Sequence, residues 1–203
     1  FGSIAMAIEP AASTIEQFMH KQAERQDTNA PVLSLDPNVR PVLIKDKAAY
    51  CRRLERLFSI VDIIKISSAD MEYLYPDLSH EQAIEKILAF GPRLLVSTLG
   101  PEGSSAIGFR SDGTRFSAGA PIIPVTVVDT IGAGDTFHAA LLSWFEMNHK
   151  LSRSALESLS EQELSDALAF ANKAAAFVCS RQGAEPPVIQ DLMADTKNKG
   201  FSQ

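Results

Sequence analysis

The chain has 203 residues, of which 45% are hydrophobic and 22% are charged, and its formal net charge is −6 at pH 7. This balance is that of a globular protein, and the length suffices for one α/β domain with a sizeable core. The negative charge argues against nucleic acid or an anionic membrane as the main partner, and no apolar run is long enough to span a bilayer.

Apolar spacing and turn residues divide the chain into alternating helices and strands. In chain order we expect a helix at 10–25, a strand at 32–35, a helix at 46–58, a strand at 61–66, short helices at 69–75 and 80–89, a strand at 94–99, a hairpin of 105–109 with 114–118, strand-like residues at 125–128, a helix at 136–148, a polar connector at 149–160 and a helix at 161–179. This alternation predicts an α/β fold, a parallel sheet with helices on both faces. We expect residues 1–193 to form one domain and the polar residues 194–203 to form a tail.

Four polar or glycine-rich segments follow predicted strands, at 36–38, 65–67, 98–103 and 129–135. Open α/β sheets bind their ligands at the carboxyl ends of the strands. These segments are therefore the expected lining of a site. Cys51 and Cys179 have no metal-ligand spacing and are interpreted as small buried hydrophobes of a reduced, cytoplasmic protein, although their number also allows one disulfide.

The most informative segment is 129–137, Asp-Thr-Ile-Gly-Ala-Gly-Asp-Thr-Phe. Backbone N–H groups at the start of a helix, together with the helix dipole, suit an anion such as a transferring phosphoryl group. A carboxylate beside them, Asp135, suits removal of a proton from a hydroxyl. The segment is not a P-loop, because Gly-Lys-Ser/Thr is absent, nor a dinucleotide fingerprint, because Phe137 takes the place of the third glycine. The alternative is a purely structural one, in which Asp135 is an ordinary N-cap.

These segments resemble the ribokinase-like (PfkB) sugar kinases. Residues 129–142 are similar to the C-terminal signature of that family, and Thr98–Gly103 is similar to its nucleotide loop. Asp36-Pro37-Asn38-Val39-Arg40 resembles its fructokinase and 2-keto-3-deoxygluconate kinase branches, and 171–176 and 182–184 resemble its adenine-side helix and Gly-Ala turn. The resemblance implies a three-layer α/β/α fold with a mainly parallel, Rossmann-like sheet. The N-terminal strands and the β lid of the family have no counterpart in this sequence.

The resemblance also implies ATP-dependent phosphorylation of a sugar hydroxyl. Asp135 is then the base, and the amides of Gly132, Ala133 and Gly134 form the anion hole. The ATP-binding residues would be Lys65, Ser67, Thr98, Gly100, Gly103 and Asn172, and Arg40 would bind the sugar together with Asp135. Fructose is the favoured acceptor. The alternatives are a 2-keto-3-deoxygluconate kinase, in which Arg40 meets a carboxylate, and a non-catalytic nucleotide-binding module.

The resemblance further implies Mg²⁺, and a monovalent cation such as K⁺ near Asp129. The family often has Asn-x-x-Glu where this chain has Ser67 and Asp70, so Asp70 would reach Mg²⁺ through water. Structural alternatives stay open: an exposed helix acid for Asp70, a snorkelling strand-end lysine for Lys65, a loop salt bridge for Arg40 and a plain polar helix position for Asn172. We expect His138 to be packed or solvent-facing, and Arg52, Arg53 and Arg56 to form a solvated helix face.

The expected partners are a small-molecule sugar and ATP. The resemblance begins in the middle of the family, so we expect the chain to be the C-terminal part of a longer kinase, inactive on its own if the missing part supplies the sugar contacts. The full-length protein could form a homodimer.

Overall fold

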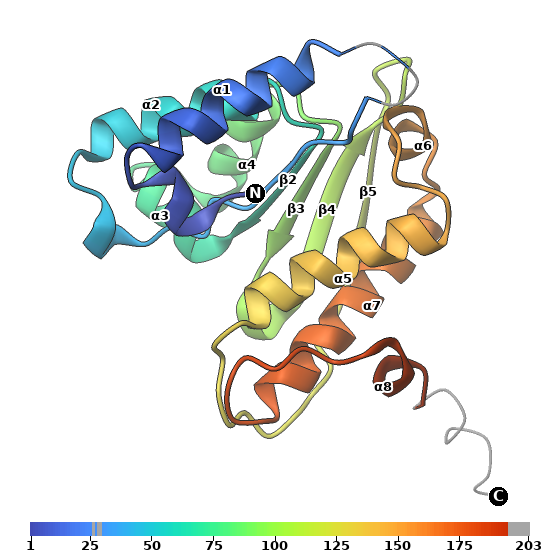
Figure 1. Ribbon diagram of the computed structural model, residues 1–203. Helices are drawn as coiled ribbons and strands as arrows, with labels where there is room; N and C mark the ends of the chain where they lie inside the picture. Colours follow the sequence, from blue (N-terminus) through green and yellow to red (C-terminus); the bar gives the residue numbers. More distant parts are fainter. Residues whose placement is uncertain (26, 28–29, 195–203) are drawn as a thin grey trace, which may run out of the picture.

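A five-stranded mixed sheet forms the middle layer of the molecule (Figure 1). The computed structural model describes residues 1–25, 27 and 30–194. The strands are β1 (Ser34–Leu35), β2 (Ile63–Ser67), β3 (Leu94–Thr98), β4 (Ser104–Phe109) and β5 (Arg115–Ala120), and they lie in this order across the sheet. β1, β2 and β3 are parallel, whereas β4 and β5 form the predicted antiparallel hairpin on the far side of β3.

Helices cover both faces of the sheet. On one face lie α1 (Ala11–Ala23), α2 (Lys47–Phe58), α3 (Ser68–Leu74) and α4 (His80–Leu88), and on the other lie α5 (Ala133–Met147), α6 (Arg153–Glu157), α7 (Glu161–Cys179) and α8 (Ile189–Ala194) (Figure 1). Short 3₁₀ helices occur at Ser3–Met6, Pro41–Leu43 and Gly100–Glu102. The predicted three-layer α/β/α arrangement is therefore confirmed.

Two hydrophobic cores result from the alternation of side chains along the central strands. Ile64 and Ile66 of β2 enter the core beneath α1–α4, whereas Ile63, their neighbour, enters the core beneath α5–α7. In β3, Leu95 enters the core beneath α1–α4 and Val96 enters the core beneath α5–α7. Both faces of these strands are buried, which explains why their sequences are continuous apolar runs rather than alternating ones.

The structure corrects two predicted elements. Residues 125–128 do not form a strand; they belong to an extended loop between β5 and α5 in which Pro121 and Pro124 lack an N–H for a strand ladder. The amides of Val128 and Asp129 donate instead to the carbonyl of Cys179 at the end of α7. The connector 149–160 contains α6, whose first turn is capped by the Ser152 hydroxyl, which accepts from the amide of Ala155.

Other boundaries agree within a few residues, and α7 begins and ends where it was predicted. Of the expected solvated arginine face, Arg52 and Arg56 are exposed as predicted, whereas Arg53 is largely covered; Arg53 and Arg56 both pair with Glu16 of α1. None of the described helices is long and apolar enough to cross a membrane. The predicted tail lies outside the described residues except for Ala194, which ends α8.

Candidate active site

The glycine turn before α5 is held in place by its neighbours. Gly132 has a φ of +80°, in the left-handed region that favours glycine, and a Cβ there would lie 2.8 Å from the Cβ of Ala184. Asp129 ties the same turn to the segment after α7, because its Oδ1 accepts from the amide of Ile131 at 3.0 Å and its Oδ2 accepts from the amide of Gly183 at 3.1 Å. These two backbone hydrogen bonds hold the pKa of Asp129 below its usual value.

Asp135 lies in the first turn of α5 and is exposed. Gly132 is the N-cap of this helix, and no side chain makes a capping hydrogen bond there, so the interpretation of Asp135 as an ordinary N-cap is wrong. The carboxylate instead accepts a hydrogen bond at Oδ1 from Nδ2 of Asn38, at 2.9 Å. Asn38 lies in the loop after β1. Its hydrogen bond to Asp135 therefore joins the carboxyl end of a parallel strand to the start of α5, where ligand sites of open α/β sheets are expected.

Lys65 is buried in β2 and forms an ion pair with Asp36, with 2.8 Å between Nζ and Oδ2. Burial raises the pKa of Asp36, and the Lys65 ammonium opposes that rise. A Cβ added to Gly134 would lie 3.2 Å from Nζ of Lys65, so the ammonium sits directly beneath the predicted anion hole. The snorkelling alternative for Lys65 is wrong. Lys65 does not line the neighbouring cleft either, so its direct contact with ATP stays a prediction.

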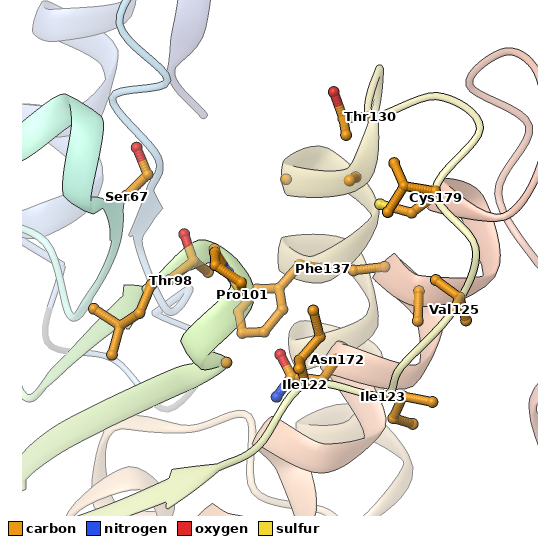
Figure 2. Close-up of a pocket in the computed structure, with 18 of the residues that line it drawn as sticks. Ser67, Thr98, Pro101, Ile122, Ile123, Val125, Thr130, Phe137, Asn172 and Cys179 are labelled. Atoms are coloured by element: carbon orange, nitrogen blue, oxygen red, sulfur yellow. The ribbon is translucent and has the colours of Figure 1, made fainter.

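A cleft of about 660 Å³ opens beside this turn, between the carboxyl ends of β2 and β3, the loop after β5, α5 and α7 (Figure 2). Seven predicted site residues line it: Ser67, Thr98, Gly100, Gly103, Ala133, Gly134 and Asn172. Figure 2 shows Ser67 and Thr98 on one side of the cleft and Val125 and Cys179 on the other, with Phe137 between them. Gly132, Asp135, Arg40, Asp70 and Asp129 do not line this cavity.

Most of the cleft wall is apolar, and sequence reasoning missed this wall. Ile122, Ile123, Val125 and Val127 come from the loop that was expected to be a strand, and three of them are exposed by more than a third. The signal that could have found them is the pair of prolines, Pro121 and Pro124, which favours a loop over a strand. Cys179 also lines the cleft. Cys51 and Cys179 are both half-buried free thiols, so their interpretation as buried hydrophobes is wrong and they form no disulfide with each other.

Asn172 fastens the apolar loop to α7. Its side chain is buried, and Nδ2 donates to the carbonyls of Ala120 at 3.0 Å and of Pro121 at 3.1 Å. The interpretation of Asn172 as a plain polar helix position is therefore wrong. The residue lines the cleft and at the same time fixes the start of the loop that forms its apolar wall (Figure 2).

Asp70 is buried at the start of α3, so the exposed-acid alternative is wrong. Its Oδ2 accepts from the amide and hydroxyl of Ser67 in a capping box, and its Oδ1 accepts from the amide of Val39 at 2.8 Å. Within the part of the chain that the structure describes, no group of three or more His, Cys, Asp or Glu residues could hold a metal ion. A role of Asp70 toward Mg²⁺ stays a prediction.

Arg40 is exposed and makes no loop salt bridge among the described residues. Its Nη1 donates to Oδ1 of Asn38 at 2.5 Å and to the backbone carbonyls of Asn38 and Val39.

His138, one turn after Asp135, is packed against β1, where its Nε2 lies 2.6 Å from the Ser34 hydroxyl. Burial, and then the nearby ammonium groups of Phe1 and Lys65, lower the pKa of His138 to about 3. His138 is therefore neutral and packed, so of its two predicted placements, packed or solvent-facing, the packed one is confirmed.

The fold and this turn define a ribokinase-like α/β protein. The chain belongs to the pfkB family of carbohydrate kinases, because residues 6–191 match the family described as "pfkB family carbohydrate kinase". A fructokinase of Rhizobium leguminosarum bv. trifolii is 37% identical over 164 residues, which are 81% of this chain and 47% of that protein. Fructokinase-2 of Oryza sativa subsp. japonica is 31% identical, over 98% of this chain and 56% of its own.

Solved structures of fructokinases have the same fold. The Vibrio cholerae O395 enzyme, in its fructose, ADP and calcium ion bound form, has a TM-score of 0.78 at 24% identity and covers 96% of this chain and 58% of its own. The Xylella fastidiosa enzyme with bound ATP has a TM-score of 0.80 at 22% identity and covers 97% and 60%. The chain spans about half the length of the curated relatives it matches.

Proposed function

We propose that this chain supplies the phosphoryl-transfer site of an ATP-dependent sugar kinase whose acceptor is fructose. One observation carries the proposal: the exposed carboxylate of Asp135 directly follows the Gly132–Gly134 turn, and this turn lies at the edge of a cleft of about 660 Å³. A pure binding module needs no base beside its anion site. The names of the similar relatives, which are fructokinases, support fructose as the acceptor.

The cleft suits ATP by its shape and chemistry. Its apolar end, around Ile123 and Val125, would hold the adenine ring, and Asn172 would lie beside that ring. The glycine-rich loop at Gly100–Gly103 lets the backbone approach the phosphates closely, because Gly100 and Gly103 both have a positive φ. The γ-phosphate would then lie at the start of α5, where Ala133 and Gly134 line the cleft.

In the proposed reaction the sugar hydroxyl oxygen attacks the γ-phosphorus of ATP, and the bond from the γ-phosphorus to the bridging oxygen breaks. The hydroxyl proton passes to Asp135, and ADP leaves with the electron pair of the broken bond. The amides of residues 132–134 stabilise the charge that develops on the phosphoryl oxygens. The Lys65 ammonium beneath Gly134 adds positive potential to the same place, although Asp36 offsets much of it.

Cations would act with the nucleotide. Mg²⁺ neutralises phosphate charge when it is bound with ATP. Asp70 already accepts three hydrogen bonds, so it suits a water-mediated contact with the metal better than direct ligation. Each carboxylate oxygen of Asp129 accepts a hydrogen bond from a backbone amide. A monovalent cation such as K⁺ would therefore be bound mainly by backbone carbonyl oxygens near this turn. A cytoplasmic location, which rests on the cysteine usage, and a homodimer of the complete protein are further parts of the proposal.

A coupled ADP-release assay on the complete protein, against a panel of sugars, tests this function. We expect ADP release that depends on fructose and does not respond to 2-keto-3-deoxygluconate. The opposite response would replace fructokinase by the keto-deoxy acid kinase, in which Arg40 meets the substrate carboxylate. ATP binding without ADP release on any sugar would support the non-catalytic module and contradict the proposal.

A further inference from the structure

Asn38 lies between two groups of opposite charge. Its Nδ2 donates to Oδ1 of Asp135 at 2.9 Å, and its Oδ1 accepts from Nη1 of Arg40 at 2.5 Å. The three side chains therefore form one line of hydrogen bonds that begins at an exposed arginine and ends at the carboxylate of the proposed base.

The chemistry of the two neighbours dictates the orientation of the Asn38 amide. A guanidinium can only donate hydrogen bonds, and an ionised carboxylate can only accept them. The amide must therefore turn its oxygen to Arg40 and its nitrogen to Asp135. An aspartate at this position could still accept from Arg40, but it would bring an acceptor and a negative charge against the carboxylate of Asp135.

The loop that carries Asn38 is anchored from below. The amide of Asn38 donates to Oδ1 of Asp36 at 3.1 Å, and Oδ2 of Asp36 pairs with the buried Lys65. The same ammonium lies against Gly134, one residue before the base. Asn38 itself has a φ of +39°, in the left-handed region that asparagine tolerates better than most residues. The loop after β1 and the start of α5 thus rest on one buried ion pair.

We propose that Asn38 is a positioning residue for Asp135, and that Arg40 acts through Asn38 rather than directly on the sugar. Asn38 holds Oδ1 of the carboxylate and thereby orients Oδ2 to take the sugar proton, and Arg40 holds the amide in the orientation that this requires. The inference deepens the proposed function and rests on it. Small losses of alignment are costly in such reactions, since a displacement of about 1 Å can lower a rate roughly 10²-fold.

Two substitutions at Asn38 test the positioning role in the complete protein. Asn38→Gly keeps the left-handed backbone without strain and removes the amide, and Asn38→Asp keeps the shape but replaces the donor to Asp135 with a negatively charged acceptor that repels it. We expect kcat for sugar phosphorylation to fall about 10-fold in Asn38→Gly and roughly 10²-fold in Asn38→Asp, with the KM for ATP within about two-fold of the wild type. Val42→Ala is the control, because Val42 lies in the short 3₁₀ helix directly after Arg40 and is 92% exposed. A purely structural role of Asn38 would instead raise the KM for ATP together with the loss of kcat.

A double-mutant cycle tests the role of Arg40. If Arg40 acts through Asn38, Arg40→Met lowers kcat in the wild-type background but has no further effect in the Asn38→Gly background. The KM for the sugar then stays unchanged in Arg40→Met. Losses that multiply in the double variant, or a raised KM for the sugar in the single variant, would overturn the assignment of Arg40.

An NMR measurement separates failure of this inference from failure of the proposed function. The side-chain amide resonances of Asn38 are assigned by their loss in Asn38→Gly and compared between the wild type, Asp135→Ala, Arg40→Met and Val42→Ala. We expect Asp135→Ala and Arg40→Met to shift them and Val42→Ala to leave them in place. Unshifted resonances in Asp135→Ala contradict the alignment even in an active kinase. Shifted resonances in a protein that phosphorylates no sugar retain the alignment and reject the proposed function.

Discussion

The two sides of the candidate site are built from different kinds of contact. Around Asp135 the contacts are short and directional, from Arg40 to Asn38 to the carboxylate and from Lys65 to Asp36. Across the cleft, Ile123, Val125 and their neighbours offer apolar surface without direction. Directional contacts set geometry, whereas apolar burial scales with area. Substitutions on the polar side should therefore change turnover, and substitutions on the cleft side should change nucleotide affinity.

The largest effect is expected at the proposed base. Asp135→Asn keeps the size of the side chain and an oxygen that can accept from Asn38, but it removes the ability to take a proton. We expect kcat to fall roughly 10²–10⁴-fold. Calorimetry should give an almost unchanged Kd for ATP, because Asp135 does not line the cleft. Turnover close to that of the wild type would remove Asp135 from the mechanism.

The glycine turn is the next most sensitive place. Gly132→Ala puts a Cβ 2.8 Å from the Cβ of Ala184 and must displace the turn, so we expect kcat to fall roughly 10²-fold. Gly113→Ala is a matched control, because Gly113 has a φ of +82°, close to the +80° of Gly132, and nothing lies within 4 Å of its added Cβ. Both variants should lose about 1 kcal/mol of unfolding free energy through backbone strain. Equal turnover in the two variants would show that the contact with Ala184 does not position the anion hole.

A smaller and different effect is expected at Asn172. Asn172→Ala leaves the carbonyls of Ala120 and Pro121 without their donor and loosens the apolar wall of the cleft. We expect the KM for ATP to rise about 10-fold, equivalent to about 1.4 kcal/mol, with kcat nearly unchanged. Ser165→Ala is the control on the same helix, since the Ser165 hydroxyl donates to the carbonyl of Gly119 outside the cleft. A fall in kcat with a constant KM for ATP would contradict the division between the two sides.

The sequence predicted the glycine turn before α5 and the strand ends at the cleft through its local motifs. The segment 129–135 carries its own signature in adjacent residues, and the strand ends at Ser67 and Thr98 follow continuous apolar runs. Such features are local, so they are visible without knowing the fold. The alternation of strands and helices also predicted the three layers, because both faces of β2 and β3 had to be covered.

The remaining features depend on contacts between residues distant in sequence. Lys65 and Asp36 are 29 residues apart and pair only because β1 and β2 lie side by side in parallel register. Asn38 reaches Asp135 across 97 residues. The run Val125–Val128 has the composition of a strand, but it finds no neighbouring strand in the described chain and instead lies against the end of α7. Propensity alone could not reveal any of these outcomes.

The last expected effect concerns stability rather than turnover, and it arises one turn after the base. His138 is held neutral on the polar side, with a pKa of about 3 that is caused mainly by burial. In the unfolded chain a histidine has a pKa of about 6.5, so between these two values the unfolded state binds more protons than the folded one. The unfolding free energy contributed by neutral His138 is thus fully present above about pH 6.5 and decreases as the pH falls, by at most about 1.4 kcal/mol per pH unit.

His138→Gln should remove this slope, because glutamine does not titrate and can still bond to the Ser34 hydroxyl. Denaturant unfolding at several pH values between 7.5 and 5 measures it. We expect the wild type to lose up to about 2 kcal/mol more than the variant over this range. Ser34→Ala is the control: it removes the hydrogen bond to His138 but leaves the burial that mainly lowers the pKa of His138, so the slope should persist. A slope that disappears in Ser34→Ala but survives in His138→Gln would mean that a different group titrates. If the pH dependence of stability is lost only in His138→Gln, burial keeps His138 uncharged near Lys65. The electrostatics of the polar side then depend on burial as well as on directional contacts.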